Sequence, residues 1–221
     1  MALPERKVEL WLASLSGSGL IFIPFTGDVK LVIPAIGLLF VLFSFIFLFR
    51  IRTIETAAHE VACALLAFLY IPFLLMHLVM LRQTPYGVQW LFVIMLIVMT
   101  NDSAAYYTGC NFGKRRLYPL VSPKKSVEGA VGGLIGSLGG TMLAKFTIFP
   151  QLTFGDAIVT AVVIGMVGQA GDLFESLLKR SFGVKDSGTL IPGHGGVLDR
   201  LDSILFAAPI TYYYVLFFFK G

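Results

Sequence analysis

Charged residues are scarce in this sequence. Asp, Glu, Lys and Arg make up 14% of its 221 residues, whereas soluble domains carry about 25%. Hydrophobic residues make up 57% of the chain, and its mean hydropathy is +0.83. This composition excludes an ordinary soluble globular protein and predicts an all-α, polytopic membrane protein.

Cysteine and histidine are also scarce. Cys63 and Cys110 lie in or beside apolar segments, which favours packing roles over a disulfide or a metal pair. His59 and His77 stand alone on apolar spans, and we expect them to be packing residues. His194 has no second histidine at metal-ligand spacing, so a zinc site is not expected. No Ser-His-Asp or Cys-His arrangement is evident either.

Long apolar runs predict about seven membrane-spanning helices, because a helix needs about 20 mostly apolar residues to cross a bilayer. The first run follows Arg6-Lys7 without a clear cleavage site, so we expect it to remain as a membrane helix. No repeat or long linker divides the chain, which predicts one integral-membrane domain over 1–221. The predicted spans are 8–25, 31–49, 57–81, 88–109, 127–149, 155–178 and 203–219.

Basic residues set the expected orientation of these spans. With the N-terminus inside, thirteen of the 17 Lys and Arg residues fall on the cytoplasmic side, as the positive-inside rule requires. The long polar segments 110–126 and 179–202 then face the cytoplasm together. The thirteen are Arg6, Lys7, Arg50, Arg52, Lys114, Arg115, Arg116, Lys124, Lys125, Lys179, Arg180, Lys185 and Arg200.

The stretch 172–202 carries carboxylates, cations and glycines between two apolar runs, which is costly at a membrane boundary unless it binds something. Asp172, Glu175 and Lys179 share one helix face, with Ser176 beside them. Asp199, Asp202 and Ser203 repeat this spacing where the last span begins. A divalent cation would relieve the repulsion among these acids and between them and phosphate, and oxygen ligands suit Mg²⁺. Six cations complement phosphate charge: Lys124, Lys125, Lys179, Arg180, Lys185 and Arg200.

Asp102 follows an apolar run and is expected inside the cytoplasmic half of the membrane. A carboxylate at that depth costs about 2.5–3.5 kcal/mol, which favours function over a structural hydrogen bond or ion pair. In the segment that begins at Ser122, Ser126 is placed to cap the next helix, whose N-terminus would favour anions. The alternative is that Lys124 and Lys125 act only as a positive-inside anchor.

Two glycine-rich segments leave alternatives open. Gly132, Gly136 and Gly140 form a groove for close helix packing, which favours contacts within the subunit over a dimer face. His194 precedes Gly195-Gly196, and ligand contact and helix capping are equally compatible with its position.

Polar residues recur in fixed patterns over residues 100–208. One long pattern reads Ser176-x-x-Lys179-Arg180-x4-Lys185-Asp186-x-Gly188, then Pro192-x-His194-Gly195-Gly196-x-x-Asp199-Arg200-x-Asp202. Shorter ones are Asp102-Ser-Ala-Ala-Tyr106-x-x-Gly109, Phe112-Gly113-Lys114, Ser122-Pro123-Lys124-Lys125-x-x-Glu128-Gly129 and Gly171-Asp172-Leu173. Together these patterns resemble the signature of the phosphatidate cytidylyltransferase (CDP-diacylglycerol synthase) family, whereas the first hundred residues resemble that family only in hydropathy. Ser103 and Ser126 stand where threonine is usual, and the chain is shorter than expected by one or two N-terminal spans.

The resemblance implies that CTP and phosphatidic acid react to give CDP-diacylglycerol and pyrophosphate. It implies a bacterial cytoplasmic membrane enzyme that uses Mg²⁺, with a second metal ion and a homodimer left open and no nucleic-acid partner. The implied metal ligands are Asp172, Asp199 and Asp202. The implied catalytic set is Asp172, Lys179, Arg180, Lys185, Asp199, Arg200 and Asp202. The implied substrate-binding set is Asp102, Ser122, Lys124, Lys125, Ser176, Asp186, His194, Gly195 and Gly196.

The sequence also bears on three other classes of protein. A related CTP-dependent transferase could act on another lipid phosphate, such as an ether lipid or a polyprenol. A transporter predicts inverted repeats and a polar site near the bilayer midplane, neither of which the sequence indicates. A purely structural membrane subunit would not need this density of carboxylates.

Overall fold

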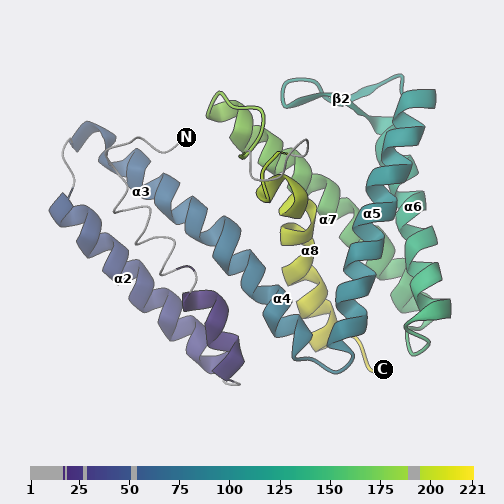
Figure 1. Cartoon of the computed structure of the whole chain (residues 1–221), viewed down its shortest axis with the longest axis horizontal. Helices are drawn as coiled ribbons and strands as arrows, with labels where there is room; N and C mark the ends of the chain where they lie inside the picture. The colour runs from purple at the N-terminus through teal and green to yellow at the C-terminus, as the bar shows by residue number, and fades with distance from the viewer. Residues whose placement is uncertain (1–16, 18, 27–28, 51–53, 189–194) are drawn as a thin grey trace. The chain divides into compact units, whose positions relative to one another are not determined.

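The computed structural model describes residues 17, 19–26, 29–50, 54–188 and 195–221. Most of these residues are helical, as predicted (Figure 1). Within these described residues, five helices are long and apolar enough to cross a membrane, which confirms an integral membrane protein. They cover Val32–Phe49, Ile54–Arg82, Gly87–Phe112, Val127–Thr147 and Phe154–Ser181.

The predicted count of seven spans stays a prediction. The span expected at 8–25 lies largely outside the described residues. The last predicted span corresponds to α8 (Leu198–Phe217), which is not among those five, and its first five residues include two aspartates and an arginine. The chain divides into two compact units, 1–80 and 81–221, and the single domain over 1–221 also stays a prediction.

The first unit contains two short 3-10 turns, Ile23–Thr26 and Val29–Leu31, before α2 (Val32–Arg50). Helix α2 lies beside α3 (Ile54–Phe68), where the rings of Phe43 and Phe68 meet edge to face at 5.8 Å (Figure 1). Helix α3 continues through a π turn, Leu69–Phe73, into α4 (Leu74–Arg82). Pro72 lies in that turn, which accommodates its missing N–H.

The second unit is organised around the close packing of α5 (Gly87–Phe112) against α6 (Val127–Thr147). The glycine stripe of α6 makes this approach possible. A Cβ at Gly132 would lie 2.2 Å from Thr108 Oγ1, and one at Gly136 would lie 2.5 Å from the Thr100 carbonyl oxygen. The stripe therefore packs within the subunit, as predicted, and a homodimer stays open.

Buried amides join α5 and α6 to α7 (Phe154–Ser181). Asn101 donates to Ser137 Oγ at 2.8 Å and accepts from Gln169 Nε2 at 3.0 Å. Gln169 also donates to the Ala130 carbonyl at 2.9 Å. These bonds satisfy polar groups inside the helix bundle and fix α7 against the α5–α6 pair.

Helix α8 packs against α7 where Gly171 removes a side chain from the contact. A Cβ on Gly171 would lie 2.7 Å from the Asp202 carbonyl oxygen and 3.0 Å from Phe206. The N-terminal turns of α8 are therefore held against the last three turns of α7. This packing brings the two acidic helix ends together.

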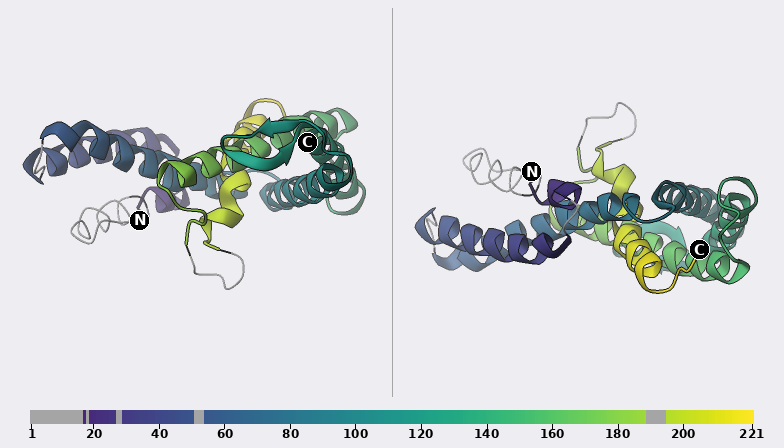
Figure 2. Two further views of the ribbon diagram at one scale, coloured as in Figure 1. Left: turned by 90° about the horizontal axis from the view of Figure 1, so that it is seen from above. Right: turned by 90° about the horizontal axis from the view of Figure 1, so that it is seen from below.

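A short antiparallel hairpin connects α5 to α6, with strands β1 (Arg116–Tyr118) and β2 (Ser122–Ser126). Ser126 caps α6 by accepting the Gly129 N–H at 3.1 Å, as predicted. The Glu128 carboxylate accepts the N–H groups of Lys114 and Arg115 at 3.0 and 3.2 Å. Seen from above, the hairpin extends from the α5–α6 pair toward α7 (Figure 2).

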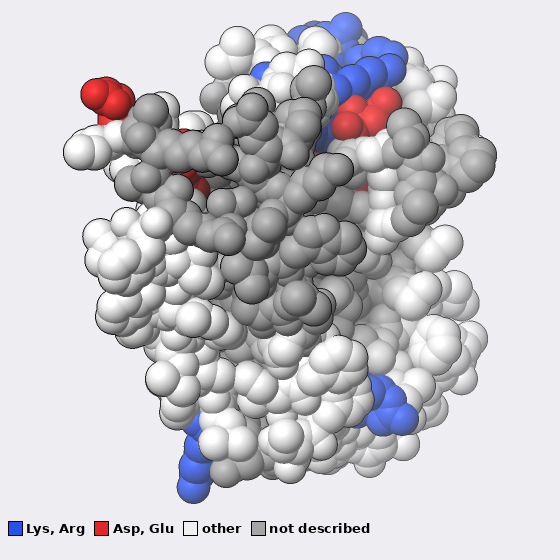
Figure 3. Space-filling view, turned by 60° about the vertical axis from the view of Figure 1, so that its left-hand side comes forward, with Lys and Arg blue, Asp and Glu red and all other residues white. Residues whose placement is uncertain are grey.

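Charged and apolar side chains are distributed unevenly over the described residues. In Figure 3 the coloured Lys, Arg, Asp and Glu side chains appear toward the top and the bottom of the view, and the described side chains between them are white. Many apolar side chains are exposed in the second unit, among them Ile135 of α6 and Phe146 of the same helix. Both features suit helices that cross a bilayer.

Candidate active site

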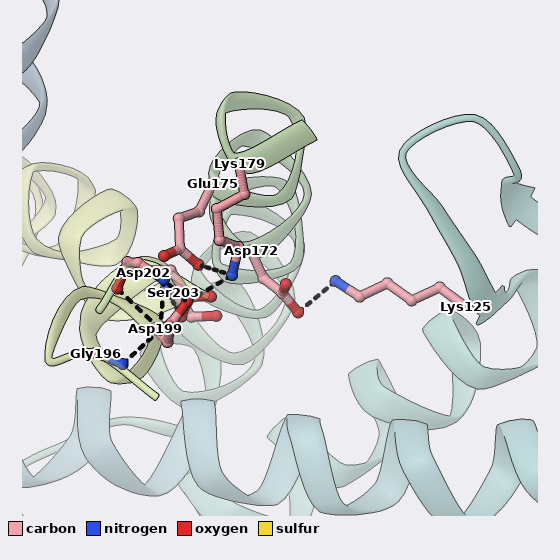
Figure 4. A network of polar contacts seen from close by, with 9 residues as sticks. Lys125, Asp172, Glu175, Lys179, Gly196, Asp199, Asp202 and Ser203 are labelled. Carbon is pink, nitrogen blue, oxygen red and sulfur yellow. Dashed lines mark hydrogen bonds and ion pairs between the residues drawn. The ribbon is translucent and has the colours of Figure 1, made fainter. Parts of the chain in front are cut away.

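Three parts of the second unit meet at one end of its helix bundle. The last three turns of α7 supply Asp172, Glu175 and Lys179, the first two turns of α8 supply Asp199 and Asp202, and β2 contributes Lys125 (Figure 4). The helical spacing of these acids onto facing helix ends therefore matches the sequence-based expectation. Their assigned roles in binding or catalysis stay predictions.

Lys179 joins α7 to α8. Its Nζ donates to Glu175 Oε2 at 2.9 Å on the same helix and to Asp199 Oδ1 at 2.7 Å on α8. Both carboxylates are largely removed from water, with side-chain exposures of 1% for Glu175 and 11% for Asp199. A shared ammonium between two buried carboxylates fixes the relative position of the two helix ends.

Asp199 also holds the chain segments that precede α8. Its carboxylate accepts the Ser187 N–H at 2.9 Å, the Ser187 hydroxyl at 2.8 Å and the Gly196 N–H at 2.7 Å. Gly195 has a φ of +83°, a conformation that glycine adopts without strain. Burial alone would raise the pKa of Asp199, but hydrogen bonds from Lys179, Gly196 and Ser187 outweigh it and hold that pKa well below its ordinary value.

Asp202 lies in the opposite electrostatic environment. Burial, followed by the nearby charge of Asp172, raises the pKa of Asp202 above its ordinary value. Its Oδ1 accepts the Ser203 N–H at 2.6 Å, and Glu175 lies beside it. Asp172 and Asp202 therefore form a pair of neighbouring acids that a cation would stabilise.

Lys125 forms an ion pair with Asp172 across 47 residues of sequence. Both side chains remain partly exposed. Asp102 on α5 interacts electrostatically with Asp172 and Lys125. It also lines a small crevice with Asn101 and Ser203. The hairpin and α5 thus contribute to the same polar end as α7 and α8.

The other residues predicted for the site differ in how far they are buried. Ser122 and Ser176 are half-buried, Gly195 is half-buried, and Gly196 is buried against Ser187. His194 lies outside the described residues, so neither alternative for it is tested. Five predicted residues are exposed: Lys124, Arg180, Lys185, Asp186 and Arg200.

Sequence reasoning left two members of this network without a role. Glu175 shares a helix face with Lys179, and its four-residue spacing was the signal that could have assigned their pairing. Ser187 gave no such signal, because its contact with Asp199 depends on how the segment before α8 folds back.

The donor chemistry fits Mg²⁺ best at Asp172 and Asp202. These acids supply oxygen ligands only, and Glu175 Oε1 beside them is buried without a hydrogen-bond partner in the described part of the chain. Among the described residues, no group of three or more His, Cys, Asp or Glu side chains is already arranged as a metal site. Asp199 could join a metal ion only by giving up donors that now occupy both of its oxygens.

Comparison with known proteins gives a consistent picture. The chain is 37% identical over 160 residues to the phosphatidate cytidylyltransferase of Bacillus subtilis, covering 72% of this chain and 60% of that protein. It is 44% identical over 126 residues to the phosphatidate cytidylyltransferase of Thermotoga maritima, covering 53% of this chain and 47% of that protein. It is also 40% identical over 165 residues to the uncharacterized protein YnbB of Escherichia coli, covering 71% and 54% of the two chains.

The chain thus spans about half to three-fifths of the length of these curated relatives. A model of the cytidylyltransferase family, in contrast, matches residues 2–218, which is nearly the whole sequence. That match includes every residue of the polar network on α7, α8 and β2. The chain belongs to the cytidylyltransferase family.

Proposed function

We propose that this protein transfers CMP from CTP to phosphatidic acid and releases pyrophosphate. The observation that carries the proposal is the cluster of carboxylates and lysines from α7, α8 and β2 at one end of a membrane-embedded bundle. Such a site can receive a water-soluble nucleotide while a lipid phosphate stays in the bilayer. Relatives named phosphatidate cytidylyltransferase support this choice of substrates.

The reaction requires little proton chemistry. A phosphate oxygen of phosphatidic acid attacks the α-phosphorus of CTP, and the bond from that phosphorus to the bridging oxygen of the β-phosphate breaks. The electron pair leaves with pyrophosphate, and the new P–O–P linkage forms CDP-diacylglycerol. Because the second pKa of a phosphate monoester is about 6, the nucleophile is already ionised near neutral pH. The site must chiefly position two anions and neutralise charge.

Mg²⁺ would neutralise the phosphates and the leaving pyrophosphate when it is bound. Asp172 and Asp202 are the proposed ligands, and Asp199 remains a candidate if its donors are released. Lys125 would exchange its contact with Asp172 for a substrate phosphate. The exposed cations Lys124 and Arg180 are placed at the same end to attract nucleotide.

We place this site on the cytoplasmic side of a bacterial inner membrane. The excess of Lys and Arg in the segments at this end supports that orientation, since positive charge is retained inside. The cytoplasm also supplies CTP. A second metal ion and a homodimer remain open within this proposal.

The test uses purified protein in detergent with labelled CTP, phosphatidic acid and Mg²⁺, with and without EDTA. We expect a CDP-lipid product that EDTA abolishes and that excess Mg²⁺ restores. Parallel reactions with a polyprenyl phosphate and an ether-linked phosphatidic acid separate a related lipid specificity from the proposed one. No CDP-lipid with phosphatidic acid under any divalent-ion condition would overturn the proposal.

The matched variants are Asp172→Asn and Glu55→Gln. Asp172 lies in the polar network, whereas Glu55 is exposed on α3 of the first unit. We expect Asp172→Asn to lose most CTP-dependent turnover and Glu55→Gln to keep it. Near-normal turnover of Asp172→Asn would refute the metal assignment.

A further inference from the structure

Glu175 is the most deeply buried carboxylate of the polar network. It is 1% exposed, although it lies only a turn of α7 away from the partly exposed Asp172. Removing a carboxylate from water is costly unless partners compensate for it. Its Oε2 accepts from Lys179, and its Oε1 has no hydrogen-bond partner among the described residues.

The compensation comes from Lys179, whose ammonium Glu175 shares with Asp199. The relative orientation of α7 and the first turn of α8 depends on this bridge. Without Glu175, the flexible lysine stem would keep one carboxylate partner instead of two. Its ammonium would then have more than one accessible position.

The bridge extends beyond α8. Asp199 uses its remaining acceptor capacity for the N–H groups of Ser187 and Gly196. A continuous set of polar contacts therefore runs from Glu175 in α7 through Lys179 and Asp199 to the two chain segments that precede α8 (Figure 4). Lys185 and Asp186 lie immediately beside Ser187 in one of these segments.

We propose that Glu175 is a positioning residue, which fixes Lys179 between the two helices and thereby keeps Asp199 aligned with Ser187 and Gly196. It does not need to touch either substrate. This inference rests on the proposed cytidylyl transfer for its kinetic consequence, but its structural consequence can be measured without any substrate. Through Lys179, Glu175 sets the geometry of a network that the transferred phosphates would contact.

The main test variant is Glu175→Met, which keeps volume and removes the charge. Removing one partner of a buried ion pair destabilises chiefly through the charge that is left unpaired, and here Lys179 would retain Asp199. We expect a modest loss of thermal stability and, in addition, amide hydrogen exchange about tenfold faster at Ser187 and Gly196 than in the wild type. Unchanged exchange at these two amides would overturn the positioning role.

Kinetics give the second readout. We expect Glu175→Met to lower kcat about tenfold or more, and the Glu175→Met, Lys179→Met double variant to be no worse than Lys179→Met alone. We expect Glu175→Gln, which keeps an acceptor for Lys179, to recover part of the loss. Additive losses in the double variant would refute action through Lys179.

Asp156→Asn is the control for general destabilisation. Asp156 lies in the first turn of the same helix, where it forms a capping box with Thr153. We expect this variant to lower stability while exchange at Ser187 stays unchanged. If wild-type protein forms no CDP-lipid but Glu175→Met speeds exchange at Ser187, the proposed function fails while the positioning role stands.

Discussion

The replacement Asp199→Asn separates two roles for this carboxylate, that of a metal ligand and that of an anchor for the segment before α8. Asp199 is 11% exposed on its side chain and accepts from Lys179, Ser187 and Gly196. The substituted amide keeps one oxygen and turns an N–H toward donors. Its charge-assisted contacts are therefore lost or reversed.

The size of the effect follows from these contacts. Hydrogen bonds to charged groups contribute about 1.5–3 kcal/mol each. Weakening the two bonds from the N–H groups of Ser187 and Gly196 should lower the free energy of local opening by about 3 kcal/mol. Since every 1.4 kcal/mol is a factor of ten, exchange protection at these amides should fall roughly a hundredfold.

Hydrogen exchange followed by mass spectrometry or NMR measures this directly in detergent. The N–H of Asp156, which donates to Thr153 Oγ1 at 3.0 Å at the start of α7, is the internal reference and should not change. Protection at Ser187 that stays within threefold of wild type would refute the anchor role. Loss of activity that high Mg²⁺ restores, with protection unchanged, would instead support a metal ligand.

The pH dependence of this anchor has a definite sign. The pKa of Asp199 lies below its ordinary value of about 3.9, so its contribution to stability is complete above that value. It is lost only as pH falls through the lowered pKa. In the Glu175→Gln variant, where position 175 carries no titratable group, we therefore expect protection at Ser187, corrected for intrinsic exchange rates, to stay constant between about pH 5 and pH 8. A titration of Ser187 protection within that range in this variant would contradict the assigned charge state of Asp199.

Three further predictions concern the rest of the second unit. Gly136→Leu places atoms against the Thr100 carbonyl and should lower the free energy of unfolding by about 3 kcal/mol or more. Gly139→Ala, by contrast, has open space around its Cβ and should stabilise the helix by up to about 1 kcal/mol. Thermal unfolding measures both variants, and equal stability of the two would refute the packing argument. Lys125→Met removes the partner of Asp172 and should raise KM for CTP at least about tenfold, so steady-state kinetics with an unchanged KM would contradict its assignment to phosphate. Asn101→Leu removes one hydrogen-bond partner each from the Ser137 hydroxyl on α6 and the Gln169 amide on α7, and it should cost about 1–3 kcal/mol in thermal stability. An unaltered melting temperature would show that the network is not stabilising.

The sequence by itself determined the features that depend on neighbours along one helix. Apolar runs located the five helices that could cross a membrane in the part of the chain that the structure describes, because spanning length and composition are local properties. Ser126 was identifiable as a cap, and the four-residue glycine spacing predicted close packing within the subunit. The same helical period placed Asp172 and Lys179 on one face of α7.

Only the tertiary structure decided which residues meet across elements. Lys179 could have paired with any nearby acid, and the packing at Gly171 brings Asp199 to it. Lys125 reaches Asp172 because the hairpin folds toward α7, a contact across 47 residues that periodicity does not encode. Helical spacing fixes contacts three or four residues apart, whereas contacts between helices depend on side-chain packing along their whole interface.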